Sequence, residues 1–191
     1  MNERHTLVRS LHDLGAAVWL GGSLMGAVGL NGASRNVMDS GDRVRVAASG
    51  WARWAPFSAA AIGAHLVGGL GLILANRGRV KGQSGVTANT VVKSALTVAA
   101  LGTTAYSGVL GAKLAKAGTV DAEGGAVPST ATPDDIATTQ QQLRGLQWAT
   151  PVLTAAIVAL GSQQGEQQRP SQMLGGFTGR VGAKVARLAG R

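Results

Sequence analysis

Four long stretches of this sequence contain no charged residue, and this pattern constrains the fold more than any other feature. They run over residues 14–33, 55–76, 94–112 and 145–165. Each is close to the roughly 20 residues that a helix needs to cross the hydrocarbon layer of a membrane. The helices of a soluble fold, by contrast, carry charged residues on the face that meets water. The sequence therefore predicts an all-α fold, an integral membrane four-helix bundle with up-down topology.

The composition agrees with this prediction. Hydrophobic residues make up 45% of the chain but aromatic residues only 4%, and the 29 glycines lie mostly among Ala, Val and Leu. Membrane helices that pack closely through small residues need few large side chains. A water-soluble bundle with unusually apolar helices is the alternative, whereas a β-barrel lacks support because the period-2 alternation of its strands is missing. The absence of cysteine excludes disulfides, thiolate metal sites and a cysteine nucleophile.

The charges divide the chain into two regions. Residues 1–165 form the predicted four-span domain, and residues 166–191 form a basic cytoplasmic tail. The formal net charge of +9 comes from Lys and Arg that lie between and beyond the uncharged runs, where such residues orient a membrane protein. Most of them fall on the side that holds both termini, so we expect cytoplasmic N- and C-termini. Membrane lipid is an expected partner, and nucleic acid is not, because no recognised nucleic-acid fold accompanies the charge.

The tail is amphipathic. Apolar residues recur along it at helical spacing, with basic residues beside them, and the residues expected to touch the membrane surface are Leu174, Phe177, Arg180, Val181, Lys184 and Arg187. This pattern is typical of a helix that lies on an anionic membrane surface. A frayed basic tail is the alternative, since several glycines weaken the helix.

A further helix start is predicted before the fourth run. Thr132 is a capping residue, Pro133 suits the first helical position, and Asp135 completes an acidic variant of the capping box. An extended outer helix that continues into the fourth span reaches roughly 30 residues or 45 Å, with a kink expected at Pro151. The loop before it is expected to be irregular. Ser40 similarly suggests a short amphipathic helix before the second span.

Small residues mark the expected contacts between helices. They share one face of the first span (Gly22, Gly26, Gly29) and one face of the second (Ala60, Ala64, Gly68, Gly71). Such faces let helix backbones approach closely, either within this chain or against a partner. Other residues near the outer ends of the spans are interpreted as an aromatic belt (Trp51, Trp54, Trp148) and as ordinary interfacial polar groups (Asn31, Gln147).

Histidine is the candidate for ligand chemistry. His65 lies near the middle of the second run, where an ionisable residue is costly and often functional. We expect it to be neutral and hydrogen-bonded to a Thr or Ser of the third span. The alternatives are a substrate contact or a metal or haem b ligand, with His12 as the partner. Depth counts against that pair, because His12 is expected at the cytoplasmic end of the first span, a mismatch of roughly 15 Å at helical rise.

His12 also belongs to a polar cluster with Asp13 and Arg9, which fits either an ion entry site or a salt-bridged helix start. Common catalytic patterns are missing from the sequence, including a phosphate-binding glycine loop, a His-Glu-x-x-His helix and paired carboxylates within the runs. We therefore expect no enzyme activity.

The segment from His12 through Trp19, Leu20, Gly21 and Gly22 resembles the first helix of small multi-pass bacterial membrane proteins related to the copper-resistance D family. The resemblance covers about twenty residues and implies a multi-pass protein of the bacterial plasma membrane, with copper handling as a possible role. No site residue is carried over, because Met25 and Met38 are isolated and Cu(I) favours clustered soft ligands. The bias towards Ala, Gly, Val and Arg also resembles actinobacterial proteins.

Three functions follow as hypotheses. The first is a non-enzymatic accessory or scaffold subunit of a larger bacterial membrane complex, with other membrane subunits as partners. The second is a haem- or metal-binding redox protein that uses His65, and the third is a carrier of a lipid or small solute.

Overall fold

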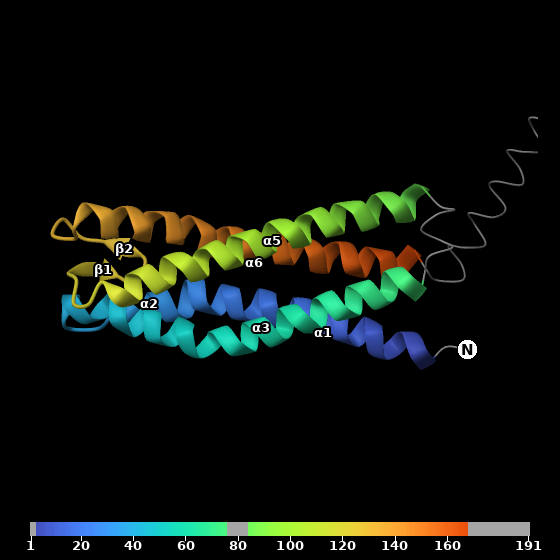
Figure 1. The fold of residues 1–191 in the computed structure, drawn as a ribbon, viewed down its shortest axis with the longest axis horizontal. Coiled ribbons are helices and arrows are strands. Elements are labelled where there is room, and N and C mark those ends of the chain that lie inside the picture. Colours follow the sequence, from blue (N-terminus) through green and yellow to red (C-terminus); the bar gives the residue numbers. More distant parts are fainter. Residues whose placement is uncertain (1–2, 76–83, 168–191) are drawn as a thin grey trace, which may run out of the picture.

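The protein is a bundle of four long helices that run side by side along its longest axis (Figure 1). The computed structural model describes residues 3–75 and 84–167, and the long helices are α1 (Glu3–Met25), α3 (Arg43–Ala75), α5 (Ser84–Lys116) and α6 (Asp134–Gln167). Consecutive helices run in opposite directions, so the start of α1 and the end of α6 lie at the same end of the bundle. The predicted four-helix, mainly α-helical fold is confirmed over these residues, and the tail predicted over 166–191 lies almost entirely outside them.

All four helices are long and apolar enough to cross a membrane. The qualifying segments are Thr6–Ser34, Ser40–Ala75, Thr87–Lys116 and Asp134–Gln163. Many large apolar side chains on the outer faces of these helices are exposed. Leu14, Phe57, Leu70 and Val98, for example, are 63 to 68% exposed. Exposed apolar surface spread around a whole bundle is unusual for a protein surrounded by water.

The bundle consists of four continuous helical segments, which we call rods, and the first rod is longer than α1 alone. A π-helical segment, η1 (Gly26–Leu30), follows α1 directly, and α2 (Asn31–Ser34) continues after it. Backbone angles remain helical at both junctions, Met25 and Asn31. Because a π turn is wider than an α turn, it changes the angular position of every residue that follows. This change matters for Asn31, whose side chain points into the bundle.

Each long helix begins 10 to 12 residues before its uncharged run. In particular, α1 begins at Glu3 and not near Leu14, so Arg9, His12 and Asp13 lie within the helix. The length of an uncharged run indicates the thickness of the apolar layer around a helix. The helix itself continues until its backbone hydrogen bonding is interrupted. The roughly 15 Å mismatch expected between His12 and His65 was wrong, because α1 packs against α3 with Gly15 beside His65 and His12 beside Gly68.

One end of the bundle carries a small folded cap, which we call the hairpin end. Here β1 (Ala122–Gly124) pairs antiparallel with β2 (Val127–Pro128), so the loop expected to be irregular contains a β-hairpin. Gln140 of α6 is fully buried and donates from Nε2 to the carbonyls of Gly124 and Gly125 at 3.0 and 3.3 Å. These two bonds fix the hairpin to α6.

Both predicted helix starts near this end are found, with differences. The Pro133 carbonyl accepts the first bonds of α6, from Ile136 and Ala137, as the position of Pro133 predicted. Thr132 has another role, since its hydroxyl donates to the Asp121 carbonyl and accepts from the Ser129 backbone. The segment at Ser40 is a 3-10 turn, η2 (Ser40–Asp42), that leads directly into α3 and not a separate amphipathic helix.

Two clusters of buried residues form the core. The middle of the bundle is packed around Trp19, Ala16, Ala100 and Ile157. The second cluster lies at the hairpin end and joins the cap to the helices, through Val44, Leu110, Leu114, Val120, Ala122, Ile136 and Leu143. The cap is therefore part of the folded core and not a loose appendage.

Glycines set the close contact between α1 and α3. A Cβ atom at Gly22 would lie 2.8 Å from Trp54 Nε1, and one at Gly26 would lie 2.7 Å from Trp51 Cζ3. On α3, Gly68 and Gly71 lie against Val8 of α1. These four members of the predicted packing faces therefore pack within the chain.

The remaining predicted packing residues behave differently. Gly29 has the side chain of Met25, from its own helix, as its nearest neighbour. Ala60 is exposed and Ala64 only half-buried, whereas the neighbouring Ala61 and His65 are buried. Near Ala60 and Ala64 the packed positions of α3 are thus the next residues, Ala61 and His65, whereas Gly68 and Gly71 pack as predicted. Gly15 of α1, which the prediction omitted, lies against Ala61 and His65.

Candidate functional site

A cavity of about 310 Å³ lies within the half of the bundle nearest the hairpin. All four rods contribute to its wall, but α3 and α5 contribute most of it. Trp19 and Ser58 line the end near the middle of the bundle, and Val44 and Gly125 line the end beneath the hairpin. From Val44 to Ser58 the cavity follows α3 over roughly 20 Å at helical rise.

Small residues line the cavity where α3 and α5 face each other. Ala52 and Ala55 of α3, and Gly108 and Ala112 of α5, are cavity residues that are also exposed at the molecular surface. A Cβ atom at Gly108 would have no heavy atom within 4 Å. The cavity therefore opens sideways between α3 and α5, and this opening is the mouth of the cavity.

A buried group of amides and an indole forms the polar part of the wall. Asn31 Nδ2 donates to Gln147 Oε1 at 2.6 Å, and Trp51 Nε1 donates to Asn31 Oδ1 at 3.2 Å. Gln147 is only 7% exposed. The interpretation of Asn31 and Gln147 as ordinary interfacial groups was therefore wrong, because they join the first and last rods inside the bundle.

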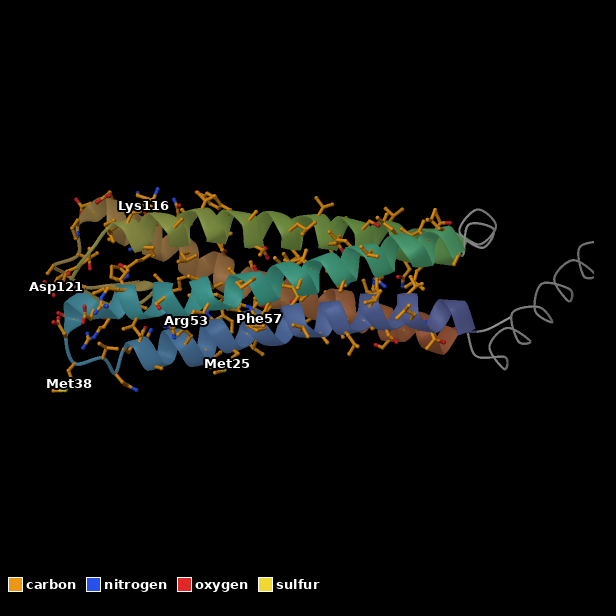
Figure 2. The ribbon with its side chains drawn as sticks, turned by 60° about the horizontal axis from the view of Figure 1, so that its bottom comes forward. Met25, Met38, Arg53, Phe57, Lys116 and Asp121 are labelled. Carbon is orange, nitrogen blue, oxygen red and sulfur yellow. The ribbon has the colours of Figure 1, made fainter. Side chains whose placement is uncertain are left out.

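The tryptophans also have more specific places than an aromatic belt. The rings of Trp51 and Trp54 lie over Gly26 and Gly22 of α1 and line the cavity. Trp148, which is 49% exposed, keeps the position expected of a belt residue. Arg53 and Phe57 lie on α3 (Figure 2), and the Phe57 ring stacks on Trp54 with ring centres 5.9 Å apart.

Two histidines lie together just beyond the inner end of the cavity. The ring centres of His12 and His65 are 4.2 Å apart, and both residues are buried. His65 Nδ1 donates to the His12 carbonyl at 3.0 Å, and His12 Nδ1 donates to Asp13 Oδ1 at 2.9 Å. The structure thus brings together the pair that the expected depth of His12 had separated, because the register of α1 against α3 places Gly15 beside His65 and Gly68 beside His12.

His65 has the neighbour that its position predicted. Its Nε2 lies 3.5 Å from the hydroxyl of Thr97 in α5, which itself donates to the Lys93 carbonyl at 2.9 Å. Trp19 lies between this pair and the cavity, since its ring centre is 6.2 Å from that of His65 and its Nε1 donates to Thr104 at 3.2 Å. His65 therefore lies in contact with α1 and α5, and its Nδ1 proton has an acceptor.

The histidine pair is not arranged around a central iron. A metal–imidazole bond is about 2 Å long, so a haem held from two sides separates the ligand nitrogens by about 4 Å and the ring centres by more. The two rings here are in direct contact. Among residues 3–75 and 84–167, moreover, no three His, Cys, Asp or Glu side chains gather as a metal-binding group.

These features were compared with known proteins. No family model, curated protein or solved structure matches the chain. The function must therefore be inferred from the site itself.

The cavity could not be predicted from the sequence. Its mouth is made of Ala and Gly residues, which usually bring helices together. On α1 they do so, but between α3 and α5 they leave space. Whether two small-residue faces meet depends on the larger residues elsewhere in the bundle, such as Trp51 and Trp54, and one sequence does not show that arrangement.

Proposed function

We propose that this chain is a multi-pass membrane protein that holds a lipid-like molecule in the cavity between α3 and α5. The observation that carries the proposal is the sideways opening of the cavity through Ala52, Ala55, Gly108 and Ala112. A cavity that opens towards the surrounding bilayer admits molecules dissolved in it. The apolar wall of such a site supplies binding energy through burial of hydrocarbon.

Membrane insertion, on which this proposal rests, is supported by two features. Four helices have the necessary length and hydropathy, and large apolar side chains cover the outer faces of the bundle. The bacterial plasma membrane, with both termini in the cytoplasm, is the location we propose from the distribution of Lys and Arg.

Filling the mouth of the cavity tests the function. Gly108→Leu places a large side chain at the mouth, and Gly102→Leu is the matched control, because Gly102 is exposed on the same helix, has no heavy atom within 4 Å of a Cβ atom and does not line the cavity. The proteins are purified in mild detergent, and native mass spectrometry measures retained lipid. We expect retention by the parent chain and by Gly102→Leu but not by Gly108→Leu. Equal retention by both variants would place the lipid elsewhere.

A second candidate function is the accessory or scaffold subunit. The cap favours it, because Ile136 and Val120 are buried in an ordered structure that stands beyond the uncharged runs and offers a rigid surface to another subunit. Cross-linking in intact membranes from the exposed Met38, which projects at the hairpin end (Figure 2), tests this role. A chain that forms no cross-linked species would contradict it.

The haem or metal hypothesis at His65 stays a prediction with a direct test. An absorbance spectrum of the purified protein, together with metal analysis, decides it. A Soret band that disappears in His65→Ala would support this hypothesis over the lipid-binding function.

A further inference from the structure

The polar groups in the wall of the cavity indicate the headgroup of the molecule it holds. This inference rests on the proposed function, since it concerns the same cavity. Gln147 Oε1 accepts the bond from Asn31, but the amide nitrogen of Gln147 has no hydrogen-bond partner among the described residues. Gln147 is 7% exposed. Because Gln147 lines the cavity, its amide nitrogen is available as a donor to a molecule held there.

A second unpartnered group lines the same cavity. The hydroxyl oxygen of Ser107 in α5 is buried and lacks a hydrogen-bond partner within the described chain. Neighbouring bonds between α5 and α6 show its level in the bundle: Thr150 donates to Thr103 at 3.0 Å, and Tyr106 donates to Gln142 at 3.1 Å. Because α5 and α6 are antiparallel, these two bonds place Gln147 level with residues 101–106 of α5, so Ser107 lies one to six residues, or roughly 2 to 9 Å, nearer the hairpin than Gln147.

The charge of the wall restricts the headgroup further. None of the described residues that line the cavity is Asp, Glu, Lys, Arg or His. A phosphate group transferred into this space would lose its hydration without gaining a cationic partner, and burial of an unpaired charge is very costly. Neutral donors such as Gln147 and Ser107 instead suit an uncharged oxygen, from a carbonyl or a hydroxyl group.

The depth of the two donors agrees with such a headgroup. Gln147 lies two residues, and Ser107 five residues, inside the ends of the uncharged runs 145–165 and 94–112 nearest the hairpin. At 1.5 Å per residue this is roughly 3 to 8 Å below those ends. In a bilayer this level is below the charged headgroups and close to the ester carbonyls.

We propose that the cavity selects an uncharged amphiphile whose carbonyl or hydroxyl oxygen accepts hydrogen bonds from Gln147 Nε2 and Ser107 Oγ. Its hydrocarbon part lies along the apolar wall formed by Trp54, Ala55 and Trp19 or leaves through the mouth. Two sources in a bacterial membrane share this chemistry, a diacylglycerol and an isoprenoid quinone. Both enter from the bilayer, and neither carries a phosphate.

Binding of lipids with different headgroups tests the headgroup class, and dioleoylglycerol and dioleoylphosphatidylglycerol form the pair with matched tails. The full chain is reconstituted in nanodiscs, and binding of dioleoylglycerol, a menaquinone and dioleoylphosphatidylglycerol is measured by native mass spectrometry. We expect at least one of the two neutral compounds to bind roughly tenfold more tightly than phosphatidylglycerol, the factor that corresponds to about 1.4 kcal/mol. The two neutral arms distinguish the two sources.

Ser107→Ala provides the residue-level arm of the test. Because the Ser107 hydroxyl has no protein partner, its removal leaves no protein group unsatisfied, and we expect normal folding with neutral-lipid binding weakened roughly five- to tenfold. Ser94→Ala, at an exposed position of the same helix, is the control and leaves binding unchanged.

The outcomes separate the two proposals. Equal binding of phosphatidylglycerol and the neutral lipids overturns the headgroup assignment and leaves the lipid-binding function intact. If Ser107→Ala does not weaken the binding of neutral lipids, the assignment is also overturned. The lipid oxygen then makes no hydrogen bond to the Ser107 hydroxyl. If no lipid binds to the parent chain, both proposals fail.

Discussion

At the scale of single residues, glycine determines how closely α1 and α3 approach. A Cβ atom at Gly15 would lie 2.5 Å from the carbonyl oxygen of Ala61, and one at Gly68 would lie 2.6 Å from that of Val8. Both neighbours are backbone atoms, which move only if the helix moves. The contact therefore tolerates no side chain at either position.

Gly68→Ala is expected to destabilise the bundle by about 1–3 kcal/mol, because the added methyl group overpacks the contact. Gly63→Ala is the matched control, since Gly63 is on the same helix, is exposed and has no heavy atom within 4 Å of a Cβ atom. There the better helix propensity of Ala should stabilise the protein by about 0.5–1 kcal/mol. Thermal unfolding in detergent measures both. Equal melting temperatures for the two variants would contradict the observed contact.

The tautomer of His65 is a second prediction at this scale. Its Nδ1 faces the His12 carbonyl, which is only an acceptor, so the proton of the neutral ring lies on Nδ1 and Nε2 carries the lone pair. Nitrogen NMR of ¹⁵N-histidine-labelled protein, assigned with His65→Gln, should show a protonated Nδ1 and an unprotonated Nε2. A protonated Nε2 in the neutral ring would contradict the hydrogen bond.

Residue roles were predicted where the requirement was local. A histidine within an apolar helix requires a polar partner, and the sequence identified the third span as its source, which Thr97 confirms. The bond between Asn31 and Gln147 joins residues that are 116 positions apart. Their pairing depends on the π turn at η1 and on how α6 lies against α1, and neither property follows from the local sequence.

At the scale of elements, α6 joins the bundle to its cap. It begins at Asp134, eleven residues before the uncharged run from Gly145, and its first turns carry Gln140 against the β-hairpin. The helix start was predictable because Pro133 and the acidic residues after it are local signals. The hairpin was not, since its strands are only three and two residues long.

Gln140→Ala should release the hairpin while the bundle remains folded. The substitution removes the bonds from Nε2 to the carbonyls of Gly124 and Gly125, and each such bond contributes about 0.5–1.5 kcal/mol. Limited proteolysis should then cut between residues 118 and 133 faster than in the parent chain. Gln141→Ala, at an exposed neighbouring position, is the control and should not change the rate. Unchanged cleavage in Gln140→Ala would show that the buried cluster alone holds the cap.

At the scale of the whole molecule, the distribution of apolar surface distinguishes a membrane protein from an unusual soluble bundle. Val98 lies in the third uncharged run and is 68% exposed, whereas Met38 lies at the hairpin end and is 98% exposed. In water, both positions would be open to a polar reagent. In a bilayer, acyl chains would cover Val98 and leave Met38 accessible from the side on which the hairpin end lies.

The chain has no cysteine, so single substitutions report accessibility directly. In intact cells, a membrane-impermeant maleimide should label Met38→Cys, whereas Ser171→Cys should react only after the membrane is opened, because the tail is expected in the cytoplasm. Val98→Cys should resist labelling in both conditions and react once detergent-solubilised protein is denatured. Rapid labelling of Val98→Cys in intact membranes would contradict insertion, since its exposure would then be to water. Reversed labelling of Met38→Cys and Ser171→Cys would keep the insertion but invert the orientation. The arginines between the first two uncharged runs (Arg35, Arg43, Arg45 and Arg53) would then explain it.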